Sequence, residues 1–294
     1  MSNRAAAIPK RGRSGLRRVA VNGKMRYSAL LLIAIASAFP IFWMLMSSLK
    51  TPQEMSAVPA VWIPSAPSLD AYQTAFGILP LGQAFLNSMI IAGGDTLAIL
   101  VTSTMAGFVF AKYQFRGHDA LFYAILATMF VPPIVTLVPL YHVLQSLGLL
   151  DSYVGVMVPQ FANAFGIFLM RQFIRGVSDE LLDAARIDGA SEWTVLWRVV
   201  APLLAPALAT LGLFAFVYQW NSFLWPLTIL QSPEKFTFVL ELSKLLGYTS
   251  SVRFENVLMA GAVVSALPGF ILFIWLQRFF VAGMAESALK GSDA

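Results

Sequence analysis

The chain has 294 residues, of which 58% are hydrophobic and only 12% are charged. A soluble domain of this length carries roughly a quarter charged residues. With a mean hydropathy of +0.72, the chain has more apolar surface than a single core in water could cover. The composition therefore excludes an ordinary soluble protein and predicts an all-α membrane protein, in which lipid surrounds the excess apolar surface.

Cysteine is absent and histidine occurs only at His118 and His142, so neither disulfides nor a His/Cys metal site is expected. The net charge is +5, and eight of the twenty basic residues precede the first apolar run. This pattern is typical of a cytoplasmic tail near anionic lipid, here residues 1–27, and nucleic-acid binding is the weaker interpretation. The first run is longer than the roughly 7–15 apolar residues of a signal peptide, so it predicts an uncleaved span.

Six apolar segments are long enough to cross about 30 Å of hydrocarbon. They lie at residues 28–49, 84–111, 120–145, 153–174, 203–230 and 257–281. The second, third and fifth exceed the length of a simple span, so we expect a tilt or a break. Pro132, Pro133 and Pro139 predict a break in the third, and Pro226 lies late in the fifth. Residues 28–282 are thus predicted as one six-helix transmembrane domain, followed by a tail at 283–294.

The basic residues predict the orientation of these spans. If the N-terminus is inside, sixteen Lys and Arg are cytoplasmic and only four lie outside, namely Lys50, Lys235, Lys244 and Arg253. We therefore expect both termini in the cytoplasm. The outer loop at residues 50–83 contains five prolines and predicts an extended segment without a domain of its own.

Residues 178–202 place five carboxylates and two arginines between two apolar runs, on the predicted cytoplasmic side. Ser178 predicts a helix N-cap, Gly189 a sharp turn, and Pro202 the start of the next membrane helix. Between them lies a helical apolar stripe formed by Trp193, Leu196, Trp197 and Val200. A connector lying on the headgroups is the alternative, but such helices are usually rich in Lys and Arg. The acidic insert favours docking to a cytoplasmic protein.

The insert resembles the cytoplasmic EAA loop of ABC importer permeases. The family pattern is Glu-Ala-Ala, three residues, Gly, nine residues, Ile, one residue and Leu-Pro. Here it reads Asp183-Ala184-Ala185, Gly189, Val199, Ala201 and Pro202, with every spacing kept. The flanking AARIDGAS resembles the carbohydrate-uptake branch, as do YQFRG at 113–117, LGLLDSYVGVMVP at 147–159, WNSFLWPL at 220–227 and LQRFFVAGM at 276–284. Residues 231–256 depart from the family pattern.

The resemblance, which covers about residues 25–290, implies the type I ABC importer permease fold and a subunit that helps to import a sugar or related polyol. It implies a second permease subunit, two ATPase subunits and an extracytoplasmic solute-binding protein as partners, in a bacterial cytoplasmic (inner) membrane. The chain contains no P-loop sequence and no catalytic cluster, so ATP and Mg²⁺ are expected on the partner ATPase and no cofactor on this chain. The implied coupling residues are Asp183, Ala184, Ala185, Arg186, Asp188, Gly189, Trp193 and Pro202.

Polar residues within the spans are candidates for the substrate pathway, because their burial in lipid is costly without a partner or a cavity. The candidates are Gln160, Asn163, Asn87, Gln219 and Asn221. Amides beside aromatic rings suit a neutral polyol, although hydrogen bonds between helices explain them equally well. Trp220 and Trp225 are better interpreted as interface aromatics. Asp95, the only acid well inside a span, supports the alternative of a stand-alone proton-coupled carrier.

Overall fold

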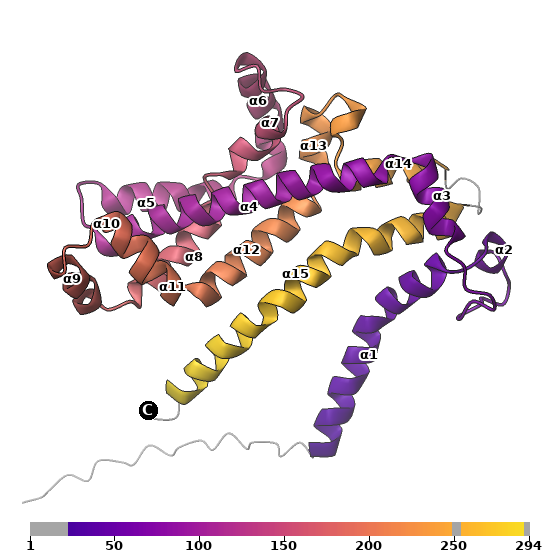
Figure 1. Ribbon diagram of the computed structural model, residues 1–294, viewed down its shortest axis with the longest axis horizontal. Coiled ribbons are helices and arrows are strands. Elements are labelled where there is room, and N and C mark those ends of the chain that lie inside the picture. The colour runs from indigo at the N-terminus through magenta and orange to yellow at the C-terminus, as the bar shows by residue number, and fades with distance from the viewer. Residues whose placement is uncertain (1–22, 249–253, 291–294) are drawn as a thin grey trace, which may run out of the picture. The chain divides into compact units, whose positions relative to one another are not determined.

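The computed structural model describes residues 23–248 and 254–290, and every regular element in these ranges is a helix (Figure 1). Most of the predicted basic tail at 1–27 and the last residues of the predicted tail at 283–294 lie outside the described residues. The chain divides into two compact units, residues 1–43 and 44–294. Helix α1 (Gly23–Ser48) supplies all described residues of the first unit and continues into the second.

The described helices account for the six predicted spans. Segments of three helices are long and apolar enough to cross a membrane by themselves: Tyr27–Ser48 in α1, the whole of α4 (Leu81–Lys112), and Glu255–Phe279 in α15 (Glu255–Lys290). Three bent helix pairs bring the total to six if each pair is one span. The all-α membrane fold is confirmed. Helix α4 stays unbroken although the sequence predicted a tilt or a break there, and α15 continues to Lys290, beyond the predicted end of its span.

The third predicted span is broken at its prolines, as expected. Helix α5 (His118–Ala127) and the short η1 (Thr128–Phe130) end before Pro132, and α6 (Pro133–Ser146) leaves at 105°. Pro139 is accommodated inside α6. The fourth span bends by 46° between α7 (Tyr153–Met157) with η2 (Val158–Gln160) and α8 (Ala164–Arg175). Each bend frees backbone groups, which are tolerated at membrane depth only inside protein or beside a cavity.

The fifth span differs from the prediction at its start. Helix α10 (Glu192–Thr194), the π-helical η3 (Val195–Val200) and α11 (Ala201–Leu203) form one run, and α12 (Ala205–Trp220) leaves it at 85°. Pro202 therefore does not open the membrane helix, and this prediction was wrong. Proline lacks the N–H that would bond four residues back, and the preceding turn is π-helical. The break falls at Leu204, and Pro206 occupies the first turn of α12.

Several short helices complete the fold. They are α2 (Pro52–Met55), α3 (Asp70–Ile78), α13 (Leu224–Ile229), η4 (Pro233–Lys235) and α14 (Phe238–Tyr248). The loop at residues 50–83 is thus partly helical, although its prolines predicted an extended segment. Helices α3 and α14 lie at the end of α4 opposite α10, whereas α13 lies nearer α6 and α7 (Figure 1). Ala71 and Ala75 of α3 are buried in a cluster with Trp220 and Phe238. Trp220 is only 2% exposed and its indole donates to Ser265 O over 2.9 Å. Its prediction as an interface aromatic was therefore wrong.

The helices α4, α8 and α12 form the centre of the second unit. Helices α4 and α8 approach closely because each has a glycine at the contact. A Cβ at Gly107 would lie 2.7 Å from Met170 Cβ, and one at Gly166 would lie 2.3 Å from Ser103 Oγ. A buried cluster of Ile99, Phe108, Met170, Ile174 and other apolar side chains continues from this contact to the acidic insert at residues 178–202. The insert and part of the cavity wall therefore pack in the same apolar cluster as α4.

Candidate coupling helix and transport cavity

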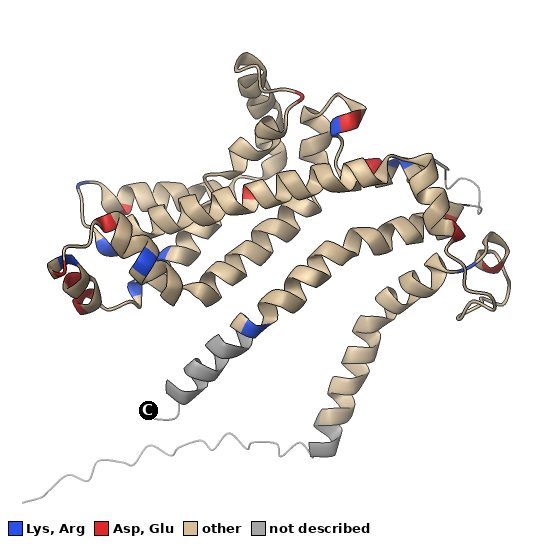
Figure 2. Ribbon diagram, viewed as in Figure 1, with Lys and Arg blue, Asp and Glu red and all other residues tan. Residues whose placement is uncertain are grey.

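The acidic insert at residues 178–202 begins with helix α9 (Asp179–Ile187). Ser178 caps it, since its Oγ accepts from the Leu181 N–H over 3.4 Å. Asp179 and Glu180 occupy the first turn and Arg186 the last, where each charge complements the helix dipole. The predicted N-cap and the predicted helix are both present. Figure 2 shows the acidic residues gathered on α9, whereas the long helices are almost free of charge.

Helix α9 ends in a turn that requires glycine. Asp188 is the C-cap, and Gly189 follows with a φ of +85°. No atom lies within 4 Å of a Cβ built on Gly189. The backbone conformation therefore selects glycine here, because a left-handed φ is costly for other residues. Ser191 then caps α10. The turn lets α9 project away from the helix that follows it.

The two faces of α9 differ. Leu182 is 1% exposed and packs in the cluster with Phe108, Ile174 and Val195, with Ala185 beside it. The opposite face is exposed and contains Leu181, Asp183, Ala184 and Ile187, the last at 86%. Leu181 is apolar but 42% exposed. The exposed face thus combines apolar side chains with acidic ones, a composition suited to a protein interface.

Arg186 connects α9 to two other elements. Its guanidinium donates to Asp183 Oδ1 (2.9 Å), to both oxygens of Glu192 (2.8 and 3.2 Å), and to the Tyr113 hydroxyl (3.3 Å). The hydrogen bonds to Glu192 and Asp183 raise the pKa of Arg186 above its ordinary value. Arg186 therefore stays charged, and its planar fork fixes the orientation of α9 relative to α10.

Trp193 is 60% exposed and meets Trp197 edge to face, with ring centroids 5.7 Å apart. Leu196 and Val200, the other members of the predicted stripe, are buried in the central cluster. The stripe is therefore split: its later residues anchor η3, while Trp193 stays at the surface. Trp193 and Glu192 also line an apolar hollow of about 530 Å³ beside Phe108 and Tyr113.

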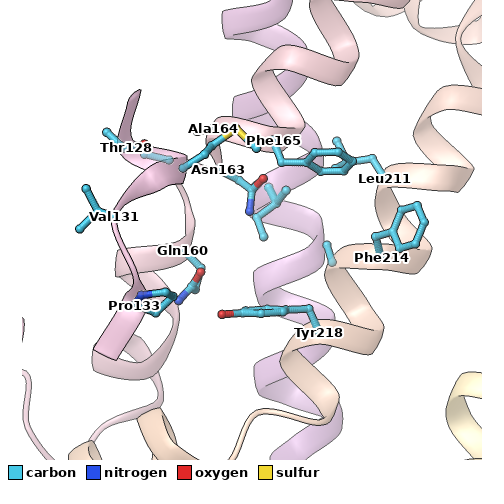
Figure 3. A pocket seen from close by; sticks show the side chains of 14 residues that line it. Thr128, Val131, Pro133, Gln160, Asn163, Ala164, Phe165, Leu211, Phe214 and Tyr218 are labelled. Carbon is cyan, nitrogen blue, oxygen red and sulfur yellow. The ribbon is translucent and has the colours of Figure 1, made fainter. Parts of the chain in front are cut away.

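A cavity of about 590 Å³ lies between the bent third span, the start of α8 and α12. Figure 3 shows the amides of Gln160 and Asn163 on one side and the rings of Phe165, Phe214 and Tyr218 on the other, with the Tyr218 hydroxyl pointing across the space. The residues that line it are Ile99, Thr128, Met129, Val131, Pro133, Gln160, Ala162, Asn163, Ala164, Phe165, Leu211, Phe214, Ala215 and Tyr218. None of them is charged.

A second cavity of about 520 Å³ shares Pro133, Gln160 and Tyr218 with the first. Its polar lining includes Thr136, Asn221 and Ser222, and again no charged residue is present. Since the two cavities share these three residues, they adjoin each other, and residues of α12 line both. Amides, hydroxyls and aromatic rings without charge can bind an uncharged hydroxylated solute.

The five predicted pathway residues separate into two groups. Gln160, Asn163 and Asn221 line the cavities. Asn87 is 1% exposed and bonds to Gln83, the Tyr153 hydroxyl and the carbonyls of Glu234 and Phe236. Gln219 is 4% exposed and lies outside both linings. The structure therefore gives Asn87 a role in joining elements, while the amides at the cavities remain candidates for contact with solute.

Asp95 is 1% exposed, and neither carboxylate oxygen has a hydrogen-bond partner among the described residues. It lines neither cavity.

Three residues of the first cavity, Tyr218, Phe214 and Thr128, were not predicted from the sequence. Tyr218 had a usable signal, because a hydroxyl inside an apolar span must find a partner or a cavity.

The chain matches the family described as "binding-protein-dependent transport system inner membrane component" over residues 100–286. It belongs to this family. It is 34% identical over 265 residues to the arabinooligosaccharides transport system permease protein AraQ of Bacillus subtilis (strain 168). The match covers 89% of this chain and 93% of AraQ. It is 31% identical over 263 residues to the lactose transport system permease protein LacG of Rhizobium radiobacter, covering 90% and 95%.

A crystal structure of a bacterial ABC transporter involved in the import of the acidic polysaccharide alginate shares the fold, with a TM-score of 0.78 at 25% identity. The match covers 88% of this chain and 96% of that one. The chain is thus a permease subunit of a binding-protein-dependent ABC importer, and the alternative of a stand-alone proton-coupled carrier is set aside.

Proposed function

We propose that this permease carries a neutral sugar or related polyol into the cell and that α9 is its coupling helix. The observation that carries the proposal is the geometry of α9: one face buried in the core, the other exposed, and a glycine turn directly after it. Displacement of such a helix by a partner would move the packed helices behind it. The proposed coupling residues are Asp183, Ala184, Ala185, Arg186, Asp188, Gly189 and Trp193.

The proposed solute is uncharged because both cavities lack charged residues. Transfer of an anion into such a space without a cation would be costly. Gln160, Asn163, Asn221 and Tyr218 supply donors and acceptors, and Phe165 and Phe214 supply flat apolar faces. AraQ and LacG are named for arabino-oligosaccharide and lactose transport, which is consistent with a neutral saccharide.

The proposed assembly has a second permease, two ATPase subunits and an extracytoplasmic solute-binding protein. ATP and Mg²⁺ would bind to the ATPase subunits, because this chain has no P-loop sequence. Both termini would lie in the cytoplasm of a bacterial cell, since that orientation places sixteen of twenty basic residues inside. On this orientation α9 faces the cytoplasm, where the ATPase subunits are.

The test is to purify the tagged chain in mild detergent, identify its partners by mass spectrometry, and reconstitute the assembly in proteoliposomes. We expect a second six-span permease and a P-loop ATPase to copurify. We also expect ATP-dependent uptake of lactose or arabinotriose, delivered by the binding protein that copurifies. Recovery of the chain alone, with solute uptake that needs no ATP, would contradict the proposal.

A further inference from the structure

The last residue of α4 has its charge almost entirely out of water. The Lys112 side chain is 7% exposed, and its ammonium lies 2.7 Å from Asp179 Oδ1 and 2.5 Å from the Val177 carbonyl oxygen. A lysine at the cytoplasmic end of a span normally extends toward water or lipid headgroups. Here it is turned toward the start of α9, 67 residues along the chain, where it donates to Val177 O and to Asp179 Oδ1.

The next residue of the chain contacts the other end of α9. The Tyr113 hydroxyl accepts a hydrogen bond from Arg186 Nη2 over 3.3 Å, and Arg186 is at the same time paired with Glu192 of α10. Tyr113 also packs edge to face on Phe108, with ring centroids 5.8 Å apart. Two consecutive residues at the end of α4 therefore bracket α9 at its first turn and its last.

The covalent connections of α9 are less constraining than these contacts. The segment before it contains Gly176, and the turn after it is formed by Gly189 in a left-handed conformation. Leu182 also packs in the buried cluster, but an apolar contact is non-directional, so α9 could still pivot about it without moving its neighbours. By contrast, α4 is continuous from Lys112 to Ile99, a residue in the wall of the first cavity. A straight helix passes an axial or lateral displacement along its whole length.

We propose that Lys112 and Tyr113 form a lock that makes α9 and α4 move together, so that displacement of α9 reaches the cavity through α4. This inference rests on the proposed role of α9 as the coupling helix. Lys112 and Tyr113 are positioning residues: they touch neither nucleotide nor solute, and they act through Asp179 and Arg186. Without the lock, α9 would still dock and ATP would still be hydrolysed, but the cavity would no longer respond.

The test uses the complete assembly in nanodiscs and a readout that needs no transported sugar. The chain contains no cysteine, so Ala162→Cys, at an exposed position in the cavity lining, introduces its only thiol. N-ethylmaleimide labels that thiol at a rate that reports access to the cavity, measured on this subunit with and without ATP. Phosphate release measures hydrolysis in the same samples.

We expect ATP to change the labelling rate roughly tenfold in the parent Ala162→Cys assembly, a size typical of coupling between two sites. In the Lys112→Met/Tyr113→Phe variant we expect that change to disappear while the basal rate of hydrolysis stays within about twofold. Two matched controls remove the same groups nearby: Arg116→Met at an exposed charge and Tyr123→Phe at an exposed hydroxyl. Both controls should respond as the parent does.

A charge exchange separates the lock from simple damage to the fold. Lys112→Asp and Asp179→Lys should each abolish the ATP-dependent change, and the two together should restore it. An unchanged ATP response in the Lys112→Met/Tyr113→Phe variant, or no recovery in the exchanged pair, would overturn the lock. If the parent assembly itself showed no ATP response, the proposed coupling function would fail instead, so the two failures are distinguishable.

Discussion

Helix α9 and the cavity use opposite chemistry. Around α9, charged side chains join segments far apart in the sequence, as Lys112 does with Asp179 at 2.7 Å and Arg186 does with the Tyr113 hydroxyl at 3.3 Å. Around the cavities, amides, hydroxyls and aromatic rings face the space and no charged residue is present. The two regions are connected by the same helices, α4 and α8, whose packed cluster extends from Leu182 to Ile99.

This difference follows from what each region must do. Transmission of a displacement requires directional contacts that keep their geometry while one helix moves against another. Charge-assisted and bidentate hydrogen bonds provide such contacts. Passage of a solute requires contacts strong enough to admit it and weak enough to release it, which neutral hydrogen bonds and ring contacts provide. The comparison predicts that substitutions near α9 alter coupling, whereas substitutions in the cavity alter apparent affinity.

The largest effect is expected for Gly189→Val. The φ of +85° is strained for any side chain and most for a β-branched one, so α9 should be misdirected while the membrane helices stay folded. Uptake in proteoliposomes should fall on the order of a hundredfold. Gly77→Val, at a helical glycine with no atom within 4 Å of its Cβ position, is the matched control. Normal uptake by a well-expressed Gly189→Val assembly would contradict the assignment of α9 as the coupling helix.

A smaller effect is expected for Asn163→Asp in the cavity. Asn163 caps α8 through its Oδ1, which accepts from the Gly166 N–H over 2.7 Å, and aspartate can make the same cap. The change replaces an amide donor at the cavity by an uncompensated negative charge. We expect KM for uptake to rise roughly tenfold with kcat and Tm nearly unchanged. A loss of kcat at constant KM would place Asn163 in coupling and not in solute contact.

Tyr218→Phe should have a milder effect of the same kind. It removes only the hydroxyl that points across the cavity (Figure 3). The loss of one neutral hydrogen bond to solute should raise KM about threefold, measured by uptake over a range of sugar concentrations. No change in KM would show that solute passes without contacting this wall.

The smallest effect is expected outside both regions, at Asp151 in the connection between α6 and α7. Lys235, Ser232 and the Gln231 backbone donate to its carboxylate and lower its pKa. Its contribution to stability is therefore fully present above its ordinary pKa of about 3.9 and is lost as the pH falls toward the folded-state pKa. Asp151→Asn should lower Tm by about a degree or two at pH 6 and less at pH 3.5. An equal difference at both pH values would contradict this account.

The sequence predicted the class, the approximate span positions and the helix and turn of the acidic insert because each depends on local signals. Apolar run length gives the spans, Pro132 and Pro133 give the 105° break, and Ser178 and Gly189 give the limits of α9. The prediction that Pro202 starts the next membrane helix was wrong because the turn before it is π-helical and the break falls at Leu204. A proline marks a site of backbone adjustment but does not determine which residue makes it.

The cavity was only partly predictable. Gln160, Asn163, Asn87 and Gln219 carry the same signal in the sequence, an amide inside an apolar run. Their separation into cavity-lining and buried groups depends on contacts from residues far along the chain, such as the carbonyls of Glu234 and Phe236 for Asn87. The same limit explains why Lys112, interpreted from sequence as an orientation signal, proved to be paired with Asp179.

Cross-linking from the exposed face of α9 tests the central claim most directly. In this chain, which has no cysteine of its own, Ile187→Cys introduces one thiol at a position that is 86% exposed. A bifunctional thiol reagent applied to membranes should join it to a subunit whose peptides include a P-loop, whereas Ile134→Cys on α6, exposed to 62%, should not. Absence of that product from a fully assembled, transporting complex would contradict the assignment of α9 as the coupling helix.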